Sequence, residues 1–138
     1  MGKVMILLND AKEFDSIESL TLFVKSIIDS LPYEIVCAAY LDNENNLMAL
    51  VRLNGGTATS VDANAEDLIG YANAILCKRV VVYHNHPSGS AVPSESDIVA
   101  TRRLYKLTFV NGIKLSDHIV VSKNGYHSVL SDLPDIAL

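Results

Sequence analysis

The chain has 138 residues, of which 49% are apolar and 20% charged, a composition typical of one globular domain rather than of a disordered or fibrous protein. Its formal net charge of −5 argues against a nucleic-acid-binding surface, because phosphate contacts need clustered Lys and Arg. We therefore expect a single domain over residues 1–138, folding alone or as a small homo-oligomer and without nucleic acid as a partner.

The first residues, MGKVMILLND, include five consecutive apolar residues within residues 3–8, which predict a short strand. This run is too short for a signal peptide or a membrane span, so we expect a cytoplasmic protein with no membrane contact. Asp15 and Glu18 then form a capping-box pattern, and the apolar residues beyond them recur at helical spacing. A helix ending near Ser30 is predicted.

Residues 33–42, YEIVCAAYLD, are rich in β-branched and aromatic residues and lead through the polar turn NENN into LMALVRL. Two strands joined in this way predict a hairpin. The segment TATSV, residues 57–61, is interpreted as a further short strand. Leu68, Tyr71, Ala72 and Ile75 fall on one helical face, which predicts a helix over residues 64–76.

Residues 79–84, RVVVYH, are typical of a strand that is buried on both faces, and therefore of a central strand. Ser94 begins a segment that ends at Asn-Gly and predicts a helix to about Val110. Two further strands are predicted within residues 115–130, joined at Lys123, Asn124 and Gly125. This order predicts a mixed β-sheet flanked by helices, an α+β or three-layer α/β fold.

The two cysteines, Cys37 and Cys77, each lie inside an apolar run, and neither belongs to a C-x-x-C pair. Such cysteines are typical of buried thiols in a reducing compartment. A zinc site made of cysteines is excluded.

The stretch HNHPSGSAVPSESD, residues 84–97, has the composition of a metal site. His84 and His86 stand at the end of the central strand, so both side chains project to the same face with Cα atoms roughly 6.6 Å apart. Asp97 falls in the first turn of the next helix and would complete a His₂Asp set with a fourth position for water, the pattern of catalytic zinc. Ser94, three residues before Asp97, would lie on the same side of the helix start, and its hydroxyl could donate to a developing oxyanion near the metal.

The same residues also have an ordinary structural interpretation. Ser94 is a normal N-cap, and Asp97 occupies the position where an acidic side chain completes a capping box and suits the helix dipole. Against this, two histidines at the mouth of an apolar strand place polar groups where a sheet favours Val or Ile. On the residues alone, both interpretations stay open.

The His-x-His-Pro and Ser-x-x-Asp pattern, with its seven-residue spacer, resembles the JAMM (MPN+) metalloproteases, and in particular their bacterial RadC-like JAB branch. GGTATSV, HNHPSG, TRRL and DHIVV also look like that branch, so the resemblance extends from about residue 34 to residue 128. It implies a JAB/MPN-like fold with a cytidine-deaminase-like three-layer architecture and a motif-bearing core at about residues 33–130. Full-length RadC proteins carry a helix-hairpin-helix region ahead of this domain, and we expect none here.

The resemblance further implies a zinc-dependent metallopeptidase that hydrolyses peptide or isopeptide bonds of a protein or peptide substrate. His84, His86 and Asp97 would hold Zn²⁺, and the metal would activate a water molecule. Glu34, which matches the family's distant glutamate, would act as general base and acid between this water and the leaving amine. Ser94 would stabilise the oxyanion.

A second hypothesis is a non-catalytic binding or scaffold module with the JAB fold, associated with DNA-repair-type RadC proteins. A zinc nucleobase deaminase is disfavoured because it needs H-x-E and P-C-x-x-C, and neither is found. Asp117 and His118 alternate across a predicted strand, so only one of them can face the site and orient a ligand imidazole. For both, a surface or core role is the favoured interpretation.

Overall fold

The computed structural model describes residues 5–53 and 60–136. Its strands and helices follow in the order β1 (Met5–Lys12), α1 (Ile17–Ile28), β2 (Val36–Leu41), β3 (Leu47–Arg52), α2 (Ala65–Ala74), β4 (Arg79–Asn85), α3 (Glu95–Val110), β5 (Lys114–Ser122) and β6 (Gly125–Ser128). Two short 3₁₀ turns, Asp62–Asn64 and Leu130–Asp132, precede α2 and follow β6.

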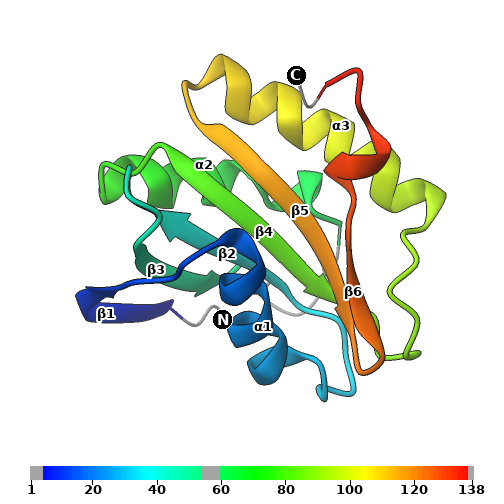
Figure 1. The fold of residues 1–138 in the computed structure, drawn as a ribbon. Helices are drawn as coiled ribbons and strands as arrows, with labels where there is room; N and C mark the ends of the chain where they lie inside the picture. Colours follow the sequence, from blue (N-terminus) through cyan, green and yellow to red (C-terminus); the bar gives the residue numbers. More distant parts are fainter. Residues whose placement is uncertain (1–4, 54–59, 137–138) are drawn as a thin grey trace.

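The six strands form one sheet in the order β1-β3-β2-β4-β5-β6. Neighbouring strands are antiparallel except β4 and β5, which run parallel and are connected through α3. Helix α1 packs on one face of the sheet, while α2 and α3 pack on the other (Figure 1). The predicted mixed sheet flanked by helices is confirmed, in three layers.

Strand β4 lies in the middle of the sheet because its side chains are apolar on both faces. Val80 and Val82 enter the core beneath α2 and α3, whereas Val81 and Tyr83 enter the core beneath α1. Burial of each such side chain contributes about 1.5–3 kcal/mol. The strand is thereby fixed from both sides, and it delivers its carboxyl end, with the two histidines, to a defined position.

Two local predictions need correction. The N-cap of α1 is Ser16 instead of Asp15: Ser16 Oγ accepts from the Ser19 amide, and Ser19 Oγ accepts from the Ser16 amide, each at 3.1 Å. A serine hydroxyl can thus complete a capping box where glutamate was expected. Of the strand predicted at residues 57–61, residues 57–59 lie outside the described residues, and Ser60 and Val61 belong to no strand.

The cysteines are buried and unpaired, as predicted. Burial raises the pKa of Cys37 to about 12, so its thiol stays protonated and unreactive at neutral pH. Helix α3 has 16 residues, and among the described residues no helix combines the length and apolarity needed to cross a bilayer.

Candidate metal centre

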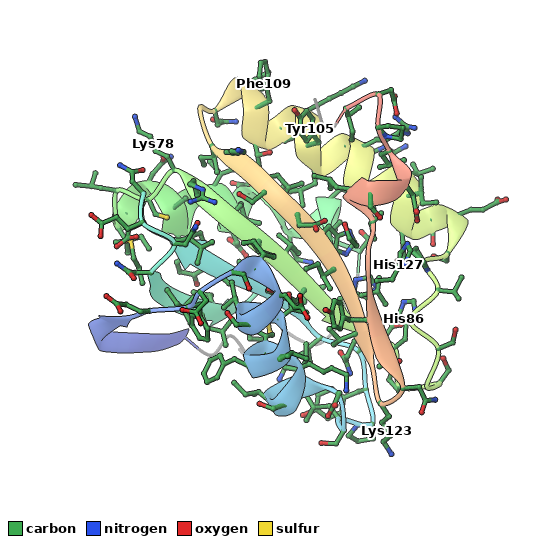
Figure 2. All side chains as sticks on the ribbon, in the orientation of Figure 1. Lys78, His86, Tyr105, Phe109, Lys123 and His127 are labelled. Atoms are coloured by element: carbon green, nitrogen blue, oxygen red, sulfur yellow. The ribbon has the colours of Figure 1, made fainter. Side chains whose placement is uncertain are left out.

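The carboxyl end of β4 carries the histidine pair. His84 belongs to the strand, and His86 follows its last residue, Asn85. Both imidazoles lie on the same side, with Nε2 atoms 2.9 Å apart. His84 is only 3% exposed, and His86 lies at the end of the sheet from which the chain leaves for α3 (Figure 2). The two side chains therefore project to the same face of the strand, as their spacing in the sequence predicts.

Asp97 reaches the histidines from the first turn of α3. Ser94 is the N-cap of this helix: its Oγ accepts from the Asp97 amide at 3.0 Å, and Asp97 Oδ2 accepts from the Ser94 amide at 2.8 Å. The same carboxylate places Oδ1 3.4 Å from His84 Nε2 and Oδ2 3.3 Å from His86 Nε2. The capping and metal-binding interpretations are thus compatible, because the capping box holds the carboxylate where the imidazoles converge.

These distances fit a four-coordinate zinc ion. Zinc–ligand bonds of about 2.0–2.1 Å at tetrahedral angles place neighbouring ligand atoms about 3.3 Å apart. Both distances between a histidine nitrogen and an Asp97 oxygen match this separation. The two histidine nitrogens, 2.9 Å apart, would have to move apart only slightly to bind the same ion. Among the side chains that the structure describes, those of residues 13–53 and 60–136, His84, His86 and Asp97 form the one group of at least three His, Cys, Asp or Glu residues that could hold a metal ion.

The electrostatics of Asp97 also suit a cation. Burial by itself would raise the pKa of this carboxyl group, but hydrogen bonds with the His84 side chain and the Ser94 amide outweigh it and hold the pKa well below its usual range. Asp97 is therefore ionised at neutral pH. One carboxylate beside two imidazoles is a donor set that suits a borderline-soft divalent ion such as zinc.

The second nitrogen of each imidazole is also hydrogen-bonded. His86 Nδ1 lies 3.0 Å from the Ser90 carbonyl oxygen, and His84 Nδ1 lies 2.8 Å from Nε2 of His118 in β5. Burial lowers the pKa of His118 well below its usual range, so this imidazole is neutral. Proteins commonly orient metal-binding histidines by such contacts to the second nitrogen.

A β-bulge decides which of Asp117 and His118 faces the site. Leu115 pairs with Val80 but Asp117 pairs with Val81, so Ser116 is the extra residue and His118 pairs with Val82. His118 lies on the same sheet face as its partner Val82. Because His84 follows Val82 by two residues in β4, it lies on that face as well. Asp117 instead accepts from the His118 amide at 2.8 Å and the Ser128 hydroxyl at 2.9 Å. The sequence alone does not reveal the bulge and gave His118 no preferred role at the site.

A pocket of about 330 Å³ opens beside the cluster. His86, Asp97 and Ser94 line it together with Glu34, which precedes β2. The Ser94 Oγ lies 2.9 Å from the Ser96 Oγ, and either hydroxyl can donate. The five residues singled out in the sequence thus come together, with four lining the pocket and His84 in direct contact with His86 and Asp97.

Asn85, between the two histidines, secures the backbone on both sides of Glu34. Its Oδ1 accepts from the Ile35 amide at 2.8 Å, and its Nδ2 donates to the Tyr33 carbonyl at 2.9 Å. The Asn85 side chain is fully buried. The middle residue of HNH, to which sequence reasoning assigned no role, therefore attaches the segment carrying Glu34 to the strand that carries the histidines.

We expect Asn85→Ala to lower the free energy of unfolding by about 1–3 kcal/mol, because the buried Ile35 amide would lose its partner. Urea unfolding measures this change. As a control, Asn43→Ala alters an exposed turn asparagine and should change stability by less than about 0.5 kcal/mol. Equal stabilities of Asn85→Ala and wild type would show that the two hydrogen bonds contribute nothing.

A larger cavity of about 710 Å³ lies elsewhere, at the amino end of β5 and the carboxyl half of α3. Lys78, Tyr105 and Phe109 line it, and Figure 2 shows them at the opposite end of the sheet from His86. No histidine lines this cavity, so its size does not connect it with the metal chemistry.

A model of the family described as RadC-like JAB domain matches residues 14–133. A UPF0758 protein of Aromatoleum aromaticum is 34% identical over 115 residues, which cover 83% of this chain and 51% of that protein. A UPF0758 protein of Streptococcus sanguinis is 34% identical over 95 residues, covering 69% of this chain and 42% of that protein. The chain spans about half the length of the curated relatives it matches.

Proposed function

Because the chain belongs to the family of RadC-like JAB domains, we propose that it is a zinc-dependent hydrolase of peptide or isopeptide bonds. One observation carries this proposal: ligand atoms of His84, His86 and Asp97 lie within 4.8 Å of one another, beside a pocket that Glu34 and Ser94 also line. A zinc ion held by these three side chains would supply a Lewis acid that makes water a nucleophile near neutral pH.

Glu34 is proposed as the general base and acid. Its carboxylate would take a proton from the attacking water and then deliver it to the amine of the leaving group. Asn85 supports this role, because its hydrogen bonds to Tyr33 and Ile35 hold the backbone on either side of Glu34. The glutamate is therefore carried by a fixed segment rather than by a free loop.

Ser94 is proposed to stabilise the oxyanion that forms when water adds to the carbonyl. In the capping box its Oγ accepts the Asp97 amide proton, so the hydroxyl proton of Ser94 takes no part in this bond. When Ser96 Oγ is the donor in the contact between the two serines, the Ser94 proton can turn toward the pocket. A donor held at this position can favour the transition state over the ground state.

The test is hydrolysis by zinc-loaded protein of a panel of peptides and of lysine-linked isopeptides, followed by mass spectrometry. We expect cleavage of at least one class, loss of cleavage after removal of the metal with a chelator, and recovery with Zn²⁺ but not with Mg²⁺. Magnesium should fail because it favours oxygen ligands and octahedral geometry, unlike this two-imidazole set.

The same experiment separates hydrolysis from the non-catalytic alternative. Stoichiometric zinc without cleavage of any panel member would contradict the proposed hydrolase and favour a binding or scaffold module that retains the metal. Cleavage that persists after complete removal of the metal would contradict the metal-dependent mechanism itself.

A further inference from the structure

A chain of three hydrogen bonds, two of them buried and the third partly buried, connects two of the proposed metal ligands. His84 Nδ1 lies 2.8 Å from His118 Nε2, His118 Nδ1 lies 2.6 Å from Thr101 Oγ1, and Thr101 Oγ1 lies 2.6 Å from the Asp97 carbonyl oxygen. His118 and Thr101 are fully buried, and His84 is nearly so. Strand β4, strand β5 and helix α3 each contribute to this chain.

The donor and acceptor in each of these hydrogen bonds can be assigned by starting from the Asp97 carbonyl oxygen. A carbonyl oxygen can only accept, so the single hydroxyl proton of Thr101 must be used in the bond to Asp97. The proton between Thr101 and His118 must then come from His118 Nδ1. Because the buried His118 is neutral and has one N–H, its Nε2 carries no proton and accepts from His84 Nδ1.

We propose that Thr101 and His118 are positioning residues that keep the proton of His84 on Nδ1, so that the lone pair of its Nε2 faces the metal position. The idea rests on the metal-binding part of the proposed function and does not depend on hydrolysis. It extends that function to two residues that touch neither the metal position nor the substrate pocket.

The contacts of His86 support this interpretation. Its Nδ1 must donate to the Ser90 carbonyl oxygen, so Nε2 is also the nitrogen of His86 that faces the cluster with a lone pair to offer. The two Nε2 atoms lie only 2.9 Å apart, with the Asp97 carboxylate oxygens at 3.3 and 3.4 Å, a set of acceptors that stays together only when a cation, a proton or a metal ion, lies among them. The hydrogen-bonded chain thus prepares a cation site before any ion arrives.

The first experiment determines the tautomer of His118 in metal-free wild-type protein by long-range ¹H–¹⁵N correlation of the imidazole nitrogens. We expect a neutral ring with the proton on Nδ1, both before and after zinc is added. A proton on Nε2 of His118, or a doubly protonated ring at neutral pH, would overturn the proposal. This result does not require that the protein bind zinc or hydrolyse anything.

The second experiment measures zinc affinity by competition with a chromophoric chelator. Thr101→Val removes the acceptor for His118 Nδ1 with little change in shape, and we expect zinc to bind about 10–100-fold more weakly, the usual effect of losing a partner that orients a ligand. Thr101→Ser keeps the hydroxyl and should restore most of the affinity. In Thr101→Val, the His118 resonances should also show the Nε2–H form.

Helix α3 offers a matched control in Thr108, a second fully buried threonine, which lies about two turns further on. Its hydroxyl donates to the carbonyl oxygens of Leu104 and Tyr105 and has no link to the histidines. Thr108→Val should therefore leave zinc affinity unchanged at a comparable cost in stability. Equal affinities of Thr101→Val, Thr108→Val and wild type would overturn the proposal. If Thr101→Val does not fold, the wild-type tautomer of His118 decides alone.

Discussion

His86→Ala is expected to purify without zinc, whereas the wild type should retain about one equivalent. The variant loses one of three proposed protein ligands and leaves His84 Nε2 and Asp97 without their common neighbour. Since loss of an outer partner alone weakens metal binding about 10–100-fold, loss of a ligand should weaken it by more than about 100-fold. Elemental analysis of protein purified without chelators or a histidine tag gives the stoichiometry.

His127→Ala is the matched control. His127 lies in β6 and contacts Asp132 at 2.7 Å, outside the metal-ligand cluster, so its removal should leave the zinc content unchanged. A wild type that binds no zinc, even after zinc is supplied and the excess removed, would contradict the metal site. Equal zinc in His86→Ala and wild type would contradict the role of His86 as a ligand.

The parts of the fold that could be predicted are those in which the residues of one segment are sufficient to determine its structure. The apolar run of β4 requires burial on both faces, and Ser94 with Asp97 both starts α3 and holds the carboxylate near the strand end. His84, His86 and Asp97 lie within one short stretch, and local spacing is sufficient to bring them together. These ligand candidates could therefore be named from the sequence.

The surrounding residues depend on contacts between distant segments. His118 reaches His84 only through the parallel register of β4 and β5, and the bulge at Ser116 decides that His118 rather than Asp117 faces the site. Thr101 contacts His118 because α3, the helix that connects these two strands, brings the Thr101 hydroxyl toward β5. No periodicity along one segment encodes such register, so the sequence pattern could not select these residues.

The role proposed for Glu34 rests on the family resemblance together with its position in the structure. Its own segment reads as the exposed start of a strand, and only the family resemblance assigned it a catalytic role. The structure places it in the lining of the same pocket as His86, Ser94 and Asp97, with Asn85 securing the residues on either side. Proximity to the pocket makes a proton-transfer role testable, and it separates this role from metal binding, because Glu34 is outside the ligand cluster.

Glu34→Gln is therefore expected to keep wild-type zinc and stability while the turnover number for a cleaved panel substrate falls about 10²–10⁴-fold, the usual contribution of a positioned general base. Glutamine preserves the shape of the side chain but cannot take the proton. Initial rates at saturating substrate, with zinc measured in the same samples, give the comparison.

Glu95→Gln provides the charge control, because Glu95 lies in the first turn of α3 but does not line the pocket. It removes one negative charge near the site and should leave turnover close to wild type. Turnover within a few-fold of wild type in Glu34→Gln would exclude Glu34 as the proton carrier, because losing a required base should cost about 100-fold or more. Slow turnover together with lost zinc would instead identify Glu34 as a support of the metal site, since a proton carrier outside the ligand set can be removed without releasing the ion.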